Sequence, residues 1–207
     1  MKRYQILDIY SNSYGIVIWL IGENGERLST FRRFHPYFYI RTDSPKPLKL
    51  LKNRFKNEIK ITKTVKKELI DGEVEVFKIT ARTPAVYGKA VRFVRKHPAF
   101  TELGLYNLQL TPPQIFMYER GIFPFCIVEE YPTPQGIKLK KVDSHEKLNY
   151  TLFPLRIMEI KPETEGANPR YLRHIPPLVV RYEGVELVLD NQIEELSHLL
   201  KKKTLTC

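Results

Sequence analysis

The chain has 207 residues, 43% hydrophobic and 28% charged, a composition that excludes a mainly disordered or collagen-like protein. Its 34 Lys and Arg residues outnumber its 23 Asp and Glu residues, and the formal net charge of +11 favours a nucleic-acid or other anionic partner. The longest apolar run, 16–21, is too short to span a membrane and no signal-peptide pattern is present, so we expect a cytoplasmic, nucleoid-associated protein without a membrane partner.

The first quarter of the chain predicts strands followed by a helix. β-branched and aromatic residues predict two antiparallel opening strands and then an aromatic strand, at 4–8, 16–21 and 34–40. Pro36 lacks a backbone N–H and predicts an edge or a bulge in the aromatic strand. Ser44 and Pro45 have the chemistry of a helix start, and the apolar residues that follow predict an amphipathic helix.

The middle of the chain predicts a hairpin and a second helix. Asp71 and Gly72 are a strong turn signal between two alternating strands. Thr83 and Pro84 begin the second helix, and Pro98 ends it. With one more strand at 103–108, the order from about 34 to 110 is strand, helix, strand, strand, helix, strand. This is the split βαβ or ferredoxin-like unit, which RNA-recognition modules also use.

The rest of the chain predicts a second, smaller part. A short helix is expected at 115–120, with Gly121 at its stop position. Prolines near 132–136 indicate a linker, and the predicted elements beyond it are three strands and a final helix, at 155–160, 178–182, 185–189 and 192–203. The predicted class is α+β, with a β-rich, barrel-like domain at 1–130, a linker at 131–149 and a partial domain at 150–207.

Basic residues gather in two segments of the predicted ferredoxin-like unit. Residues 45–67 contain eight lysines and Arg54 against the single acid Glu58. The second segment is one side of the second helix, formed by Lys89, Arg92, Arg95 and Lys96. Such faces can simply be solvated. They can also contact a phosphate backbone, which makes binding depend on salt.

Aromatic residues allow two interpretations as well. In the strand 34–40, Tyr37 and Tyr39 lie on the face opposite Phe38, so one set belongs to the core and the other could stack on bases. Tyr10 and Tyr14 carry the same ambiguity.

The sequence offers little for catalysis. The five histidines have no zinc-ligand spacing, and Cys126 and Cys207 are interpreted as free thiols. Glu159, Glu163 and Glu165 could hold Mg²⁺ at the end of a strand, although exposed loop acids are the favoured interpretation because Lys161 lies among them.

Four segments in the same order resemble the N-terminal domain of archaeal family-B DNA polymerases. The segment 34–40 is similar to its Arg-Pro-Tyr-aromatic-Tyr segment, and 5–10 is similar to its opening strand. The segment 91–99 is similar to a helix end, and 117–124 to its Tyr-Leu-Ile-Asp-Lys-Gly-Leu-Ile-Pro stretch. The resemblance implies a replication protein of the nucleotidyltransferase class and a role in holding template DNA.

The segment 155–166 resembles the first 3′–5′ exonuclease motif of that family, on a domain of RNase H-like fold. Aligned with that motif, Lys161 stands where a metal-binding aspartate belongs, and Glu163 keeps its place. An ammonium removes a Mg²⁺ ligand and adds a positive charge. The resemblance therefore implies an inactive, truncated exonuclease region that binds no metal, although the intact family uses Mg²⁺.

The family's N-terminal domain also has a pocket that captures deaminated bases. Its motif matches Tyr10, Pro36 and Tyr37, with Val86 or Tyr87 near the matching place on the second helix. Pro112 and Ile115 replace an aromatic and a basic residue of the family, so template binding is implied more strongly than base discrimination. The full set expected to bind nucleic acid is Tyr10, Pro36, Tyr37, Lys52, Lys56, Val86, Lys89 and Arg92.

The function expected from these observations is that of an amino-terminal polymerase part. It would bind single-stranded or primer–template DNA, and it would lack polymerase and exonuclease activity on its own. Two alternatives stay open. The chain could be an assembly subunit that docks with a separate carboxy-terminal polymerase chain, or it could be a free-standing RNA-binding module, which only the order of its elements suggests.

Overall fold

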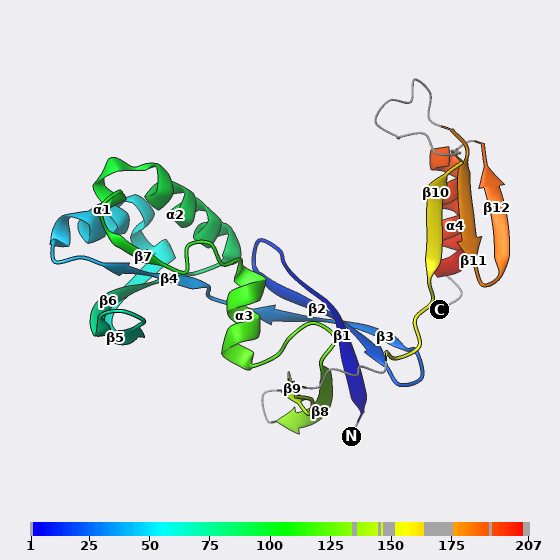
Figure 1. The fold of residues 1–207 in the computed structure, drawn as a ribbon, viewed down its shortest axis with the longest axis horizontal. Helices are drawn as coiled ribbons and strands as arrows, with labels where there is room; N and C mark the ends of the chain where they lie inside the picture. Colours follow the sequence, from blue (N-terminus) through cyan, green and yellow to red (C-terminus); the bar gives the residue numbers. More distant parts are fainter. Residues whose placement is uncertain are drawn as a thin grey trace. The chain divides into compact units, whose positions relative to one another are not determined.

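A computed structural model of the protein describes residues 2–133, 136–144, 146, 152–163, 176–190 and 192–204. The chain divides into two compact units, Met1–Pro154 and Leu155–Cys207. Within the described residues, three antiparallel sheets and four α-helices are present, which confirms the α+β class (Figure 1). No helix in this described part of the chain is long and apolar enough to cross a membrane.

The first sheet has the spatial order β3-β2-β1-β8-β9, with antiparallel neighbours throughout. Its strands are β1 (Arg3–Ser11), β2 (Gly15–Gly22), β3 (Arg27–Arg33), β8 (Ile127–Thr133) and β9 (Gly136–Lys141). The pairing of β1 with β2 confirms the two predicted opening strands. The sequence did not predict β3, because this strand is exposed along most of its length and lacks a clear alternation of apolar residues.

The end of the first unit differs from the predicted linker at 131–149. Residues 131–133 and 136–141 belong to the β8–β9 hairpin, and β8 pairs with the start of β1. Pro132 suggested a break in the chain. It lies beyond the part of β8 that pairs with β1, where its missing N–H costs little. The backbone N–H of Phe153 donates to Oε1 of Gln5, so the first unit extends well past residue 130.

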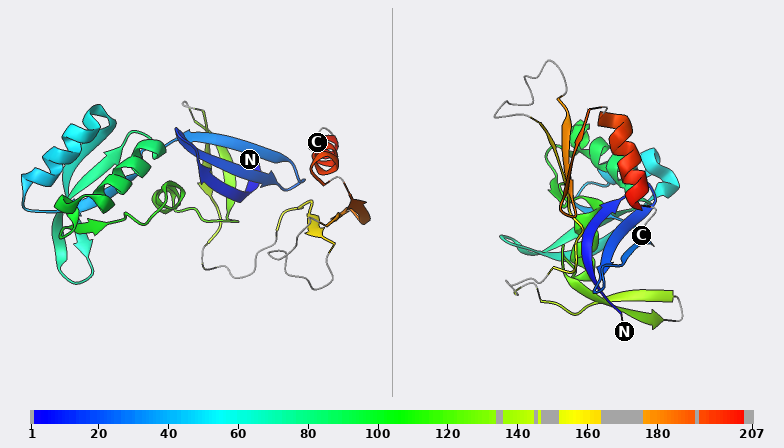
Figure 2. Two further views of the ribbon diagram at one scale, coloured as in Figure 1. Left: turned by 90° about the horizontal axis from the view of Figure 1, so that it is seen from above. Right: turned by 90° about the vertical axis from the view of Figure 1, so that its right-hand side faces the viewer.

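The second sheet, also in the first unit, has the spatial order β5-β6-β4-β7 and is antiparallel throughout. Its strands are β4 (Tyr37–Arg41), β5 (Ile59–Glu68), β6 (Gly72–Ala81) and β7 (Gly104–Tyr106). Helix α1 (Pro45–Phe55) follows β4 and α2 (Pro84–Lys96) follows β6, which confirms the predicted order of elements. The two helices lie side by side on one face of this sheet (Figures 1 and 2).

Local chemistry explains where these helices begin. The Ser44 side chain accepts a hydrogen bond from the N–H of Lys46, and the Thr83 side chain accepts one from the N–H of Val86. Proline follows both caps, at the position where a helix needs no N–H donor. Both predicted helix starts are confirmed.

Pro36 does not mark the edge or bulge that the sequence suggested. Strand β4 lies between β6 and β7, in the interior of the sheet. Pro36 is buried immediately before the strand, and its carbonyl accepts the N–H of Ala81 at 2.9 Å. A proline ahead of the first strand residue removes no ladder donor, so an interior strand can follow it.

One hydrophobic core joins both sheets of the first unit. Helix α3 (Pro112–Arg120) contributes Phe116, whose ring contacts that of Phe34 edge-on at 5.3 Å between centroids. The helix ends at Gly121 in the left-handed region at φ +60°, where glycine is favoured, which confirms the predicted stop. α3 also packs against β1 and β2 of the first sheet.

The second unit contains β10 (Met158–Pro162), β11 (Leu178–Tyr182), β12 (Val185–Leu189) and α4 (Gln192–Thr204). The sheet order is β10-β11-β12. The predicted strands and final helix are confirmed, except that the first strand begins at Met158 and not at Leu155. Glu183 and Gly184 both have positive φ, as a two-residue hairpin turn requires.

Gly88 provides a test of how α2 is built. It lies inside the helix, and a Cβ added there meets no atom within 4 Å. Gly88→Ala is therefore expected to raise the free energy of unfolding by about 0.5–1 kcal/mol, because alanine loses less backbone entropy on folding. Urea denaturation measures the change. Gly15→Ala is the contrasting variant and should be destabilising, since its Cβ would lie 2.2 Å from the Arg32 carbonyl oxygen.

Candidate nucleic-acid interface

A groove of about 500 Å³ lies between the last turn of α1 and the second half of α2. We call it the α1–α2 groove. Its lining comprises Arg54, Phe55, Glu58, Lys89, Arg92, Phe93, Lys96, His97 and Pro98. Four cations thus face one carboxylate. The shape and charge suit a chain of phosphates, since each cation can neutralise one of them.

Aromatic contacts form the apolar base of this groove. The rings of Phe55 and Phe93 meet edge-on at 5.9 Å between centroids, and the His97 ring lies 5.1 Å from that of Phe93. Phe55 is buried and anchors the last turn of α1, next to exposed Arg54. The groove is therefore held by core packing and presents charges on a fixed surface.

The spacing along α2 explains which cations share the groove. Lys89, Arg92 and Lys96 follow the i, i+3, i+7 pattern of one helix face, and all three are exposed. Arg95, grouped with them from sequence, donates from its guanidinium to the Leu108 carbonyl at 2.8 Å and does not line the groove. Two of the expected binding residues, Lys89 and Arg92, are thus brought together.

The two α1 lysines in the expected set lie outside the groove. Lys52 is exposed in the last turn of α1, and Lys56 is exposed at its C-cap, where the 3-10 helix η1 (Lys56–Glu58) begins. Neither is among the groove-lining residues. Cations near a helix C-terminus also stabilise the helix itself. A binding role for Lys52 and Lys56 stays a prediction.

Tyr37 lies away from the groove, in a separate pocket of about 380 Å³ on the second sheet. The other side chains in this pocket include Tyr39, Tyr106, Tyr118 and Lys66. Tyr37 is only 6% exposed, and the Lys78 ammonium lies 3.7 Å from its ring centroid. Little ring surface is left for a base, so the structure gives its predicted stacking role no direct support.

The environment of Tyr37 also affects its ionisation. Burial, and then the neighbouring Glu119 carboxylate and Tyr39 hydroxyl, raise the pKa of Tyr37 well above its usual value. The phenol stays protonated at neutral pH and can donate a hydrogen bond. The sequence could not identify this pocket, because its tyrosines come from three segments far apart in the chain.

The remaining expected residues are scattered. Tyr10 is 42% exposed on β1 of the first sheet and lines neither the α1–α2 groove nor the tyrosine pocket. Pro36 and Val86 are buried. The structure does not gather Tyr10, Pro36, Tyr37 and Val86 around one of the cavities described here, so their roles stay predictions.

The acidic residues of the second unit lie among cations. Glu159 on β10 has the Lys161 ammonium at 3.8 Å and the Arg181 guanidinium of β11 at 3.6 Å. Glu163 is exposed, and Glu165 lies outside the described residues. Within the described part of the chain, no group of three or more His, Cys, Asp or Glu residues is placed to hold a metal ion. The Lys161 and Arg181 cations therefore compete with a metal ion for the Glu159 carboxylate.

Of the two cysteines, Cys126 is a free, buried thiol, as predicted. Burial raises its pKa, and its Sγ accepts a hydrogen bond from the N–H of Phe123 at 3.5 Å. Cys207 lies outside the described residues.

Tyr87 fastens α2 to the loop that precedes α3. Its hydroxyl lies 3.0 Å from the Asn107 carbonyl oxygen and 2.9 Å from that of Leu110. Burial raises the pKa of Tyr87 to about 12, against an ordinary value of 10.0. The folded state keeps this proton after the unfolded state has released it. The resulting stability is complete below pH 10 and is lost as the pH rises from 10 through 12.

Tyr87→Phe tests this anchor. The variant should lower the free energy of unfolding by about 1–2 kcal/mol at pH 8, because the two buried carbonyls lose the single hydroxyl donor that they share. It should also lose less stability than the parent between pH 10 and 12, in urea melts at several pH values. An equal loss of stability in the parent and the variant between pH 10 and 12 would contradict the role of the Tyr87 hydroxyl as this anchor. The variant should still lose some stability as the pH rises above 10, because the pKa of Tyr37 is raised as well.

Comparison with known proteins gives one kind of match. No family model matches the chain, and no curated protein matches it. Among solved structures, the chain is similar to the family B DNA polymerase from the hyperthermophilic archaeon Pyrobaculum calidifontis, with a TM-score of 0.62 and 19% sequence identity. The match covers 97% of this chain and 29% of that chain. The likeness shows a shared fold. This chain spans less than a third of the length of that polymerase chain.

Proposed function

We propose that this chain binds single-stranded DNA as the amino-terminal part of a family B DNA polymerase, with the phosphate backbone lying in the α1–α2 groove. The observation that carries the proposal is that Arg54, Lys89, Arg92 and Lys96 line one groove together with a single carboxylate, that of Glu58. Neutralising the strand's phosphates would release its counterions and supply the driving force. The shared fold with an archaeal polymerase supports DNA as the partner.

The finer fold assignments belong to this proposal. We assign the first unit to the polymerase N-terminal domain, with the β4–β7 sheet and its two helices as a ferredoxin-like subdomain. The strand order β5-β6-β4-β7 supports the latter assignment. The second unit is assigned to an exonuclease-type domain of RNase H-like fold. The cations around Glu159 support an exonuclease region that binds no metal.

Direct binding tests the proposal. A fluorescein-labelled single-stranded oligonucleotide is titrated with the protein, and anisotropy is followed. Saturable binding that an unlabelled DNA strand competes away is expected. A protein that leaves the anisotropy unchanged up to high micromolar concentration would contradict a DNA-binding function. RNA of the same sequence serves as the second competitor, and stronger competition by RNA would favour the RNA-binding module instead.

A second candidate function rests on the edges of the second unit. Strand β12 pairs only with β11 within the described residues, so its other edge is open to a further strand. Val185, Leu187 and Val188 on β12 are 56%, 40% and 51% exposed. An assembly role with a separate polymerase chain would cover them. Mixing the protein with such a chain should then give a complex in gel filtration and a gain in polymerase activity, and no complex would exclude the role.

A further inference from the structure

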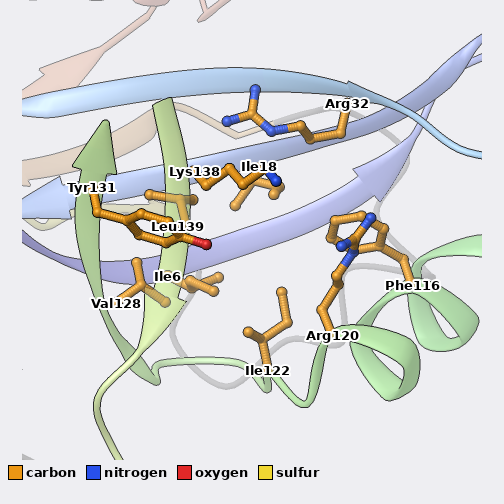
Figure 3. Close-up of a pocket in the computed structure, with 10 residues that line it drawn as sticks. All are labelled: Ile6, Ile18, Arg32, Phe116, Arg120, Ile122, Val128, Tyr131, Lys138 and Leu139. Atoms are coloured by element: carbon orange, nitrogen blue, oxygen red, sulfur yellow. The ribbon is translucent and has the colours of Figure 1, made fainter. Parts of the chain in front are cut away.

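A second cavity, of about 190 Å³, lies between α3 and the first sheet, apart from the α1–α2 groove (Figure 3). Ile122, which follows α3, and Leu139 from β9 are half-buried and form an apolar wall, beneath which Ile6, Ile18 and Val128 are almost fully buried. Phe116 from α3 lines the opposite side. The volume is below the ~300–1,000 Å³ of sites that enclose drug-sized ligands, so it suits a single ring.

Three cations surround this apolar wall. Arg32 comes from β3, Arg120 from the end of α3 and Lys138 from β9, and the Tyr131 hydroxyl and Lys138 ammonium point into the space between sheet and helix (Figure 3). Among the described residues, no Asp or Glu lines the cavity, and neither Arg120 nor Lys138 has a carboxylate partner within 4.0 Å.

Two of these cations are held in place. The Arg120 guanidinium lies 5.8 Å from the centroid of the Phe116 ring, a distance typical of a cation–π contact. Arg32 donates to the Thr30 hydroxyl at 2.7 Å and to the Phe31 carbonyl at 3.0 Å. Both arginines are therefore oriented before any ligand arrives. A planar guanidinium can bind two phosphate oxygens at once.

We infer that this cavity binds a phosphomonoester attached to a ring, with the ring on the apolar wall and the phosphate among Arg32, Arg120 and Lys138. A phosphomonoester carries a charge of about −1.5 to −2 at pH 7, which matches three cations that line one cavity better than the single charge of a phosphodiester inside a strand. The Tyr131 hydroxyl can donate a further hydrogen bond. Two sources have this chemistry: a free nucleoside monophosphate and the 5′-phosphorylated end of a nucleic-acid strand.

The inference does not depend on the proposed function, because a free nucleotide can enter this cavity without any strand in the α1–α2 groove. Loss of groove binding in variants at Lys89 and Arg92 would therefore leave it intact. Conversely, a failure at this cavity would leave the groove proposal standing.

Isothermal titration calorimetry with deoxycytidine 5′-monophosphate, whose base is a single ring, deoxycytidine and inorganic phosphate tests the free-nucleotide source. The monophosphate should bind at least about tenfold more tightly than either half alone, since each half lacks one of the two sets of contacts. A second arm compares 5′-phosphorylated and 5′-hydroxyl oligonucleotides of one sequence. Here the phosphate should improve the affinity.

Arg120→Gln and Lys138→Gln locate the binding. Each substitution should weaken binding of the monophosphate by about tenfold, because it removes one charge-assisted contact. In the oligonucleotide arm, each should remove the gain in affinity that the 5′-phosphate gives. Arg27→Gln on β3 is the matched control and should have no effect, because Arg27 is exposed and does not line the cavity, and thermal melts verify that every variant folds. The inference is supported if the protein binds in either arm and both cavity variants abolish that binding. The arm in which binding occurs identifies the source. The inference is overturned if neither arm shows binding, if binding survives both substitutions, or if inorganic phosphate binds as tightly as the monophosphate.

Discussion

Replacing Lys89 and Arg92 together by glutamate is expected to weaken binding to single-stranded DNA by roughly 30- to 100-fold at low salt. Both side chains are exposed and line the α1–α2 groove. Each substitution removes a charge-assisted contact of about 1.5–3 kcal/mol and places a negative charge where a phosphate would lie. Solvent screening reduces the combined effect to about 2–2.8 kcal/mol, which corresponds to the 30- to 100-fold loss of affinity.

The matched control changes the net charge equally at another place. Lys2→Glu with Arg27→Glu also replaces two exposed cations by anions, but both lie in the first unit away from the groove-lining residues. It should weaken binding by only about twofold to threefold, through the general field of the protein. Equal losses in the two double variants, measured by anisotropy, would show that the groove has no special role.

Phe38→Ala is expected to have the largest effect on stability. Phe38 on β4 is fully buried and contacts the Tyr87 ring of α2 edge-on, at 6.1 Å between centroids. Its removal should lower the free energy of unfolding by about 3–5 kcal/mol, since the apolar contact is lost and a cavity is left beneath α2. Much of a typical domain's stability would be lost.

Urea denaturation followed by circular dichroism measures this change. Tyr118→Ala is the control, because Tyr118 is also aromatic but is 82% exposed on α3. Its effect should stay within about 0.5 kcal/mol. A similar loss in both variants would indicate that the packing of α2 on β4 is not a main source of stability.

The elements of the fold that could be predicted are those fixed by neighbouring residues. Ser44 and Thr83 cap helices through their own side chains, Gly121 ends α3 in a left-handed conformation, and Asp71 with Gly72 turns a hairpin. Strand β3 could not be predicted in this way. It is held by its pairing with β2, which no alternation within Arg27–Arg33 reveals. The β8–β9 hairpin was mistaken for a linker because Pro132 indicates a break only when its partners are unknown.

The candidate site shows the same difference between what neighbouring residues determine and what contacts between distant segments determine. Helical spacing was enough to place Lys89 and Arg92 on one face of α2. It could not show that Arg54, from a different helix, completes the groove, nor that Arg95 is engaged by the Leu108 carbonyl. For Tyr37, the alternation along β4 does not show which face of the strand is buried. In the structure, the Lys78 ammonium lies over the Tyr37 ring and Glu119 of α3 lies beside its hydroxyl.

The salt dependence of oligonucleotide affinity tests the central claim most directly. If Arg54, Lys89, Arg92 and Lys96 each neutralise one phosphate, log K should fall linearly with log salt at a slope of about −3, since each contact on a single strand contributes about −0.7. The Lys89→Glu and Arg92→Glu double variant should reduce the steepness of that slope by about 1.4 or more. An affinity independent of salt, or a slope that the double variant leaves unchanged, would contradict DNA binding in the α1–α2 groove.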